Sequence, residues 1–358
     1  MPPRPRGPRR DAQDYVDFGV GAILGLLEDE HAAVVPELEA KISEQPYGEF
    51  PVPIDAHHLT SARKILRESR AIREDTQITR GGRPVTVITL EDDAGRRRKI
   101  EDASKRKRLL HTRYLTLAMG SNSVPALLGP GGEAVLHATL TQAAPHGFRL
   151  LRPEGGEIRS LLGKPVVGGS IDSGAILTAV DTATLATTTH LVLIEVKNVR
   201  SHLYPQALEV HQVLYKAAEV AVSRPDLSVV PVLVCRWGHF TLFTMAKQLG
   251  AFFVATKQQP ILPSKQLDVA LIDEVRDELG FRDLTITDQA LPWMVDRFAR
   301  VLPGQAKRSG ERWRQVASAV LPYSKALRTD LLSPRDRARM MEEFREAIAQ
   351  ATDEPVRW

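Results

Sequence analysis

The chain has a single cysteine, Cys235, and no long hydrophobic run. One cysteine excludes a disulfide within the chain and also excludes a cysteine-rich zinc site. No segment approaches the roughly 20 consecutive apolar residues that cross a bilayer. The N-terminus is charged and lacks the apolar core of a secretory signal. We therefore expect a cytoplasmic protein that does not bind a membrane.

The composition is that of an ordinary globular protein, with 43% hydrophobic and 26% charged residues in 358. This length accommodates two or three domains with sizeable cores. The formal net charge of +4 is compatible with a nucleic-acid partner but does not require one. Changes of pattern along the chain predict five regions: a disordered basic tail (1–12), a first domain (13–95), a basic linker or helix (96–128), a second domain (129–262) and a C-terminal helical region (263–358).

The first domain begins with a helical pattern over residues 12–43. Asp55 then has the position of an N-cap for a second helix, whose outer face is polar and basic. Two β-branched runs separated by Gly81 and Gly82 predict a β-hairpin. Helices followed by a hairpin resemble a winged helix-turn-helix module, which implies DNA binding by the second helix. The alternative is a helical protein-interaction domain with a solvated charged face.

Two sets of basic residues are candidates for binding phosphates. The first set lies on the predicted second helix and the hairpin turn, and comprises Arg63, Lys64, Arg67, Arg80 and Arg83. The second set lies in the run 96–113, and comprises Arg97, Arg98, Lys105, Arg106, Lys107 and Arg108. Such runs are often solvated helix faces, and that interpretation stays open here.

The second domain carries the residues that indicate chemistry. A break at residues 129–132 precedes a predicted helix that carries Glu133, and Asp172 stands at the start of a later strand. Glu195 and Lys197 end the strand that begins with the apolar residues 191–194. Because side chains alternate along a strand, these two charged groups emerge on one face. Buried charges are costly without partners, so this pattern predicts a site.

Carboxylates and a lysine at one sheet edge suit phosphodiester hydrolysis. Mg²⁺ or Mn²⁺ takes carboxylate oxygens and retains waters. The ion polarises a phosphate and activates water, while a lysine stabilises the charge that develops. The two carboxylates expected to hold the ion are those of Asp172 and Glu195.

The order of these elements resembles the PD-(D/E)XK, or restriction-endonuclease-like, nuclease superfamily, whose core is α-β-β-β-α-β. The resemblance covers residues 129–255 and implies a mixed α/β sheet flanked by helices. It implies that Asp172 and Glu195 bind metal, that Lys197 is catalytic and that Glu133 is an accessory acid. The family's proline before the aspartate is replaced by Ile171. Asp181 is a rival for the aspartate role.

The helix after the motif offers one further candidate. Gln212 and Tyr215 resemble the glutamine–tyrosine motif of the RecB-like branch, with a spacing of three residues where four is usual. This assigns Gln212 to the site, while Tyr215 is expected to pack.

The resulting hypothesis is a metal-dependent DNA endonuclease for restriction, defence or repair. The alternative is an inactive DNA-binding or assembly protein that retains the fold. A homodimer would supply two active sites for a double-strand cut.

Overall fold

The computed structural model describes residues 11–45, 53–79, 82–91, 95–121, 124–153, 157–161, 163–166, 169–180 and 185–358. The chain divides into two compact units. Unit 1 comprises Met1–Ala126 and Ser264–Leu284, and unit 2 comprises Leu127–Pro263 and Thr285–Trp358. Residues 96–126 of the predicted linker therefore belong to unit 1, and the predicted C-terminal region is shared between both units. Within the described ranges, no helix is long and apolar enough to cross a membrane.

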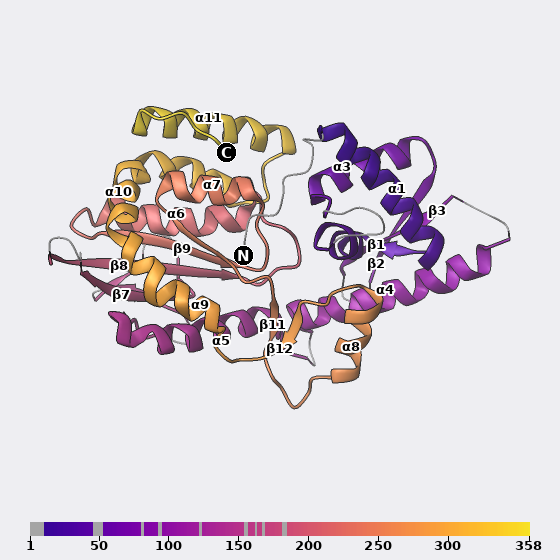
Figure 1. Cartoon of the computed structure of the whole chain (residues 1–358), viewed down its shortest axis with the longest axis horizontal. Helices are drawn as coiled ribbons and strands as arrows, with labels where there is room; N and C mark the ends of the chain where they lie inside the picture. The colour runs from indigo at the N-terminus through magenta and orange to yellow at the C-terminus, as the bar shows by residue number, and fades with distance from the viewer. Residues whose placement is uncertain are drawn as a thin grey trace, which may run out of the picture. The chain divides into compact units, whose positions relative to one another are not determined.

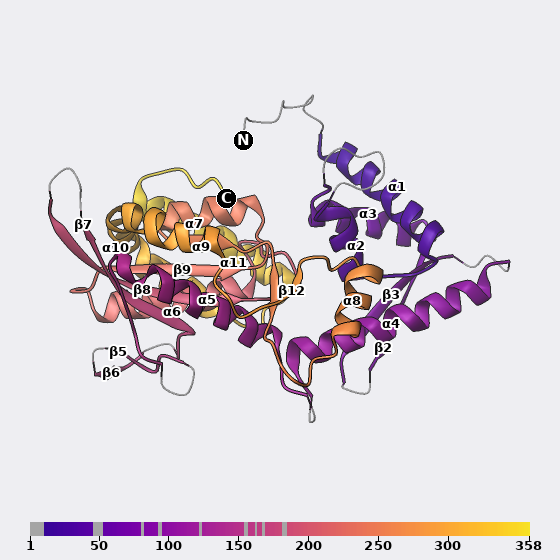
Figure 2. The same ribbon diagram turned by 60° about the horizontal axis from the view of Figure 1, so that its bottom comes forward.

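Unit 1 combines helices with a small antiparallel sheet (Figure 2). Its strands are β1 (Ala33–Val34), β2 (Ile72–Ile78) and β3 (Pro84–Leu90), in the order β1-β3-β2. Its helical segments are α1 (Ala12–Glu30), α2 (Val35–Leu38), a π-helical turn (Glu39–Ser43), α3 (Ala56–Glu68), α4 (Arg97–Met119) and α8 (Val269–Glu278). The predicted hairpin is present as β2 and β3, and the basic run lies on α4.

The helical pattern predicted over residues 12–43 is interrupted at residues 31–34, because the chain leaves the helical path after α1. His31 adopts a left-handed conformation with φ of 64°, which ends the helix. Ala33 and Val34 then pair with β3. Asp55 does occupy the N-cap position of α3, but its side chain makes no capping hydrogen bond. The helix start therefore relies on other contacts.

Unit 2 is built on a mixed five-stranded sheet, as the sequence predicts. The strands are β4 (Phe148–Leu150), β7 (Ser173–Val180), β8 (Thr187–Lys197), β9 (Val229–Cys235) and β10 (Phe252–Ala255), in the order β10-β9-β8-β7-β4. β8, β9 and β10 are parallel, whereas β7 is antiparallel to β8 and to β4. Short ladders join β5 (Ser160–Leu161) to β6 (Lys164–Pro165), and β11 (Gln259–Ile261) to β12 (Leu284–Ile286).

Helices cover both faces of this sheet (Figure 1). Leu191 and Leu193 of β8 face the first set, α6 (Leu208–Ser223), α7 (Phe240–Leu249), α10 (Leu302–Leu327) and α11 (Pro334–Thr352). Val192 and Ile194 face the second set, α5 (Leu128–Ala143), α9 (Pro292–Asp296) and a π-helical segment (Arg297–Val301). The apolar run of β8 is buried on both faces, as is typical of a central strand.

Helix α10 passes from one face of the sheet to the other. Leu302 at its start belongs to the core on the α5 face, and Trp313 belongs to the core on the α6 face. Between them lies Gly310, where a Cβ would fall 2.3 Å from Ser228 Oγ and 3.3 Å from His190 Nδ1. Since Ser228 precedes β9 and His190 lies in the first half of β8, α10 covers the amino-terminal ends of these strands. The opposite, carboxyl end of β8 carries Glu195 and Lys197 of the predicted site.

The predicted break at residues 129–132 is also wrong, because α5 begins at Leu128 and includes these residues. The glycines permit close packing rather than a turn. A Cβ on Gly132 would lie 2.9 Å from Asn198 Cβ and 3.0 Å from Val196 Cγ1. A Cβ on Gly131 would lie 2.6 Å from the Pro260 carbonyl oxygen. The first turn of α5 is therefore held against the end of β8.

Candidate active site

The last residues of β8 form the centre of the candidate site. Glu195 and Lys197 share the strand face of Leu191 and Leu193, toward α6. The Lys197 ammonium lies 3.1 Å from one Glu195 oxygen. Glu195 is only 1% exposed, so its carboxylate depends on protein partners for its charge. The sequence predicted both the face and the proximity.

A second lysine, which the sequence analysis missed, completes the environment of Glu195. The Lys216 ammonium of α6 forms an ion pair with the other carboxylate oxygen of Glu195. Lys216 follows Gln212 by four residues, so both lie on one face of the helix. That spacing was the available signal, since any helix that directs Gln212 to the site also directs Lys216 there.

Asp172 lies next to this pair. Ser173 pairs with Ile194 across β7 and β8, which sets Asp172 beside Glu195 in the register. The Asp172 carboxylate accepts a hydrogen bond from the backbone N–H of Val196 at 2.8 Å. Asp172 is thus anchored on the segment that carries the lysine and the glutamate. Asp181, the rival aspartate, lies outside the described residues.

Glu133 approaches from α5 and is solvent-exposed. Despite this exposure, the neighbouring residues remove part of the hydration of its carboxyl group, which raises the pKa of Glu133, and the negative charges of Asp172 and Glu157 add to this effect. Glu157 precedes Ile158, which bridges to Ile171 beside Asp172. Several carboxylates therefore repel one another at this end of the sheet.

The pKa values of Glu195 and Lys197 are both raised, each for a different reason. Burial and the Asp172 carboxylate raise the pKa of Glu195, although Lys197 and Lys216 oppose the shift. Burial disfavours the Lys197 ammonium, but the attraction of Glu195 and Asp172 outweighs it and raises the pKa of Lys197. Lys197 therefore remains protonated at neutral pH.

The three acids have the ligand chemistry of a divalent-ion site, but their distances do not yet match one. Asp172, Glu195 and Glu133 offer the carboxylate oxygens that Mg²⁺ prefers, and a cation would relieve their repulsion. However, their oxygens do not all lie within 4.8 Å of one another. Among the described residues, Asp55, His57 and His58 are the group that meets this condition. Both oxygens of Glu195 are instead occupied by ammonium groups.

Asn198 fixes the surroundings of the site. Its side-chain amide donates to the carbonyl oxygens of Leu128 at 2.6 Å and of Pro260 at 2.7 Å. It thereby ties the end of β8 to the start of α5 and to β11. Gln212 is half-buried on α6, and in the described part of the chain it has no hydrogen bond to the motif residues. Tyr215 is buried and packs under Arg328, as expected of a packing residue.

A row of aromatic side chains, also missed from the sequence, follows the same strand ends. The segments after β8 and β9 run side by side, bridged at Leu203 and Gly238. Alternation then places the flanking side chains on one face. His202 lies beside Trp237 with ring centroids 5.6 Å apart, and Tyr204 lies beside His239 at 4.9 Å. The Lys257 ammonium lies 5.5 Å from the centre of the Trp237 ring.

The basic residues of α3 are partly neutralised. Arg63 and Arg67 both pair with Glu74, at 2.9 and 3.5 Å. Lys64 is 66% exposed and lies 3.8 Å from Glu68. Arg83 is half-buried and donates to the carbonyl oxygens of Leu115 and Gly120, so two of its guanidinium nitrogens are engaged at the end of α4. Arg80 lies outside the described residues.

The basic run on α4 has an outer face and an inner face. Arg97, Arg98 and Lys105 are exposed, and the two arginines pair with acids one turn later. Arg106 forms a two-pronged ion pair with Glu278, and Arg108 pairs with Asp75 at 2.8 Å. These exposed or half-buried groups remain compatible with phosphate contacts.

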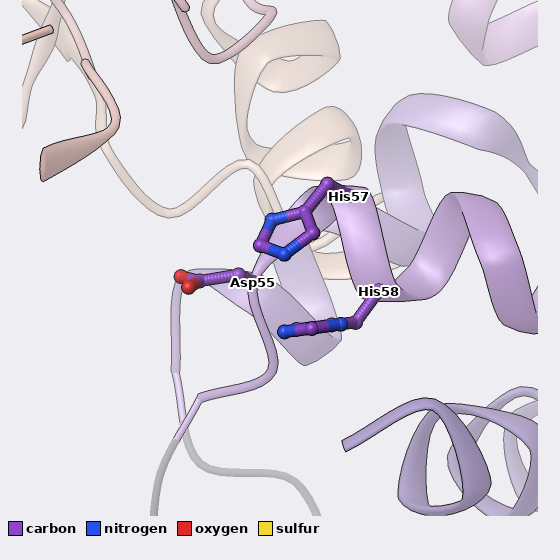
Figure 3. A group of neighbouring side chains, drawn as sticks. All are labelled: Asp55, His57 and His58. Atoms are coloured by element: carbon purple, nitrogen blue, oxygen red, sulfur yellow. The ribbon is translucent and has the colours of Figure 1, made fainter. Parts of the chain in front are cut away.

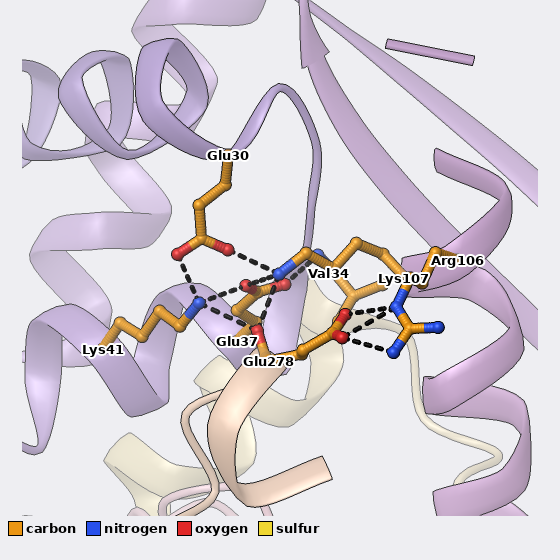
Figure 4. Close-up of polar contacts among 7 residues, drawn as sticks. All are labelled: Glu30, Val34, Glu37, Lys41, Arg106, Lys107 and Glu278. Carbon is orange, nitrogen blue, oxygen red and sulfur yellow. Dashed lines mark hydrogen bonds and ion pairs between the residues drawn. The ribbon is translucent and has the colours of Figure 1, made fainter. Parts of the chain in front are cut away.

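Lys107 differs from the other basic residues of α4, because it is buried in an ion cluster. Its side chain is 7% exposed and contacts both Glu30 and Glu37 at 2.5 Å, together with the Glu278 carbonyl oxygen at 2.6 Å (Figure 4). Lys41 binds the same three partners. This buried ion cluster joins α1, α2, α4 and α8 within unit 1.

Comparisons of the chain with protein-family models, with curated proteins and with solved structures give no match.

Proposed function

We propose that unit 2 is a metal-dependent nuclease of the PD-(D/E)XK type that hydrolyses phosphodiester bonds in DNA. The observation that carries the proposal is the convergence of Asp172, Glu195 and Lys197 at the end of β8. The order α5-β4-β7-β8-α6-β9 supports it, because it follows the α-β-β-β-α-β order of that superfamily.

Each residue has a role that its environment suits. Asp172, Glu195 and the accessory Glu133 would hold Mg²⁺ or Mn²⁺, which when bound supplies a Lewis acid and an activated water. Lys197 keeps its positive charge and stabilises the charge that develops on the phosphate. Lys216 orients the Glu195 carboxylate.

We further propose that unit 1 binds DNA as a winged-helix-like module. The order α1-β1-α2-α3-β2-β3 and the strand order β1-β3-β2 support this interpretation. Lys64 on α3, with Arg98 and Lys105 on α4, offers exposed charge for phosphates. In unit 2, the aromatic row from His202 to His239 offers surfaces on which bases can stack.

The test is cleavage of plasmid and single-stranded DNA with Mg²⁺ or Mn²⁺. We expect cleavage by the wild type and by the matched control Lys247→Ala, an exposed lysine of α7. Lys197→Ala and Glu195→Ala should not cleave. Equal cleavage by all four proteins would reveal a contaminant and remove the proposal.

The inactive DNA-binding alternative is favoured by one observation, the engagement of both Glu195 oxygens by ammonium groups. A buried carboxylate that is paired with two lysines can have a structural role without any catalytic role. Retained DNA affinity without wild-type cleavage under either metal would select this alternative.

A further inference from the structure

The start of α3 carries a cluster of metal-ligating side chains that the nuclease proposal does not use. One carboxylate oxygen of Asp55 and one ring nitrogen each of His57 and His58 all lie within 4.8 Å of one another (Figure 3). We propose that these three residues bind a divalent transition-metal ion such as Zn²⁺. This site belongs to unit 1 and does not depend on the proposed function of unit 2.

The backbone prepares this arrangement. Asp55 has a non-helical backbone, with φ of −58° and ψ of 141°, and its side chain makes no capping hydrogen bond to the helix that follows. Figure 3 shows the carboxylate on the side of the helix to which the two imidazole rings extend. The ring centroids of His57 and His58 are 3.8 Å apart and tilted by 43°. The three groups therefore converge although they are close neighbours in sequence.

Contacts with α1 hold one ligand in place. The His58 ring stacks on Tyr15 with centroids 5.4 Å apart and an interplanar angle of 16°. One turn after Tyr15, Gly19 of α1 packs closely on α3, since a Cβ at this position would lie 3.1 Å from Ala62 Cβ. Because ordering a ligand costs conformational entropy, a ring that is already held favours binding.

The donor set selects the class of metal. Two imidazoles and one carboxylate suit Zn²⁺, Co²⁺, Ni²⁺ or Cu²⁺, whereas Mg²⁺ prefers oxygen ligands alone. Three protein ligands leave a fourth position for water. In a tetrahedral site with bonds near 2.0–2.1 Å, donor atoms lie about 3.3 Å apart, so small side-chain rotations would close the site.

The position at a helix N-terminus makes the carboxylate decisive. The helix dipole places positive charge there, which disfavours a cation. The negative charge of Asp55 must offset this effect. We therefore expect metal binding to require Asp55 as well as the two histidines.

The experiment titrates the tag-free full-length protein with Co²⁺ and follows the visible absorption of the bound ion, then displaces it with Zn²⁺. To silence the acids of unit 2, all proteins carry Asp172→Asn and Glu195→Gln. We expect one bound ion in this background. Asp55→Asn, His57→Gln and His58→Gln should each weaken binding by about tenfold or more. His146→Gln, an exposed histidine of unit 2, is the matched control.

Two outcomes would overturn the inference: no Co²⁺ or Zn²⁺ binding in the background protein, or binding that the three substitutions leave unchanged. Circular dichroism confirms that each variant is folded. Failure of DNA cleavage has no bearing on this result, and failure of Co²⁺ binding has none on cleavage.

Discussion

The carboxylate of Asp172 accepts a hydrogen bond from the backbone N–H of Val196, the residue between Glu195 and Lys197. A single contact thus links the acid that precedes β7 to the charged end of β8. It gives Asp172 two separable properties, a structural one as an acceptor and an electrostatic one as a charge.

Substitution of Asp172 separates these properties. Asp172→Asn keeps an acceptor for Val196, so we expect a folded protein with cleavage reduced by about a hundredfold or more, as for loss of a charged group from a metal site. Asp172→Ala leaves that N–H without its partner and should also cost about 1–3 kcal/mol of unfolding free energy. Cleavage assays and denaturant unfolding measure the two effects. Asp330→Asn, at an exposed position, should change neither.

Loss of Lys216 should destabilise unit 2 through Glu195. Lys216→Met leaves the buried Glu195 carboxylate with Lys197 as its remaining ion-pair partner, at a cost of about 3 kcal/mol at neutral pH. The pKa of Glu195, already raised by burial, should rise further. Because a raised carboxyl pKa gives stability that is lost as the pH increases, acidification should restore part of the loss. Addition of Glu195→Gln should remove most of the pH dependence. Tryptophan fluorescence measures the unfolding, since all four tryptophans lie in unit 2.

The buried ion cluster of unit 1 predicts a pH-dependent stability. Burial raises the pKa of Glu37 from 4.5 to about 7, although Lys107 and Lys41 oppose the shift. The folded state therefore binds a proton that the unfolded state has released between these values. The contribution of Glu37 protonation to the free energy of unfolding is on the order of 3 kcal/mol. It is complete below pH 4.5 and is lost as the pH rises through about 7.

Hydrogen exchange of peptides from α1 and α4 measures this effect in unit 1 alone. Glu37→Gln, which stays neutral, should abolish the change of protection between pH 4.5 and 7. Persistence of that change in the variant would assign it to another group.

Two neighbouring lysines of α4 should behave in opposite ways. Lys105 is exposed, so Lys105→Met should leave stability unchanged, weaken DNA binding across sequences and reduce the salt-dependence slope by about 1. Lys107 is buried, so Lys107→Met should cost about 3–5 kcal/mol of stability. Binding titrations at several salt concentrations and thermal unfolding distinguish them. An unchanged salt slope for Lys105→Met would remove this residue from the DNA surface.

Two glycines of α5 provide a matched pair. Gly132→Ala places a methyl group 2.9 Å from Asn198 Cβ, so we expect displacement of α5 and weaker metal-dependent cleavage. Gly129→Ala meets nothing within 4 Å and should stabilise the helix by about 0.5–1 kcal/mol. Equal effects of the two substitutions would mean that close packing at Gly132 does not position Glu133.

The sequence predicted the elements whose pattern is local. The hairpin predicted around Gly81 and Gly82 is confirmed as β2 and β3, and the apolar run 191–194 lies in the buried strand β8. The mixed sheet and the shared face of Glu195 and Lys197 follow from the same alternation.

Features that depend on distant packing were missed or misread. Lys107 belongs to a basic run that can be interpreted as a solvated helix face. Its side chain is instead buried, where it contacts Glu30 of α1 and Glu37 of α2. The glycines at 129–132 predicted a break, whereas they lie within α5, and Gly132 allows this helix to pack closely against the end of β8. The packing of α10 against the sheet of unit 2 was not predicted. The hydrophobic pattern of a helix does not reveal which face of a sheet that helix covers.

The order of synthesis imposes a final constraint on unit 1. Lys107 and Lys41 both donate to the carbonyl oxygen of Glu278, which lies 171 and 237 residues further along the chain. A nascent chain that ends before α8 holds two ammonium groups without that acceptor. Unit 1 can therefore complete its folding only after the ribosome has added the whole sheet of unit 2, and residues 1–126 expressed alone should fold incompletely.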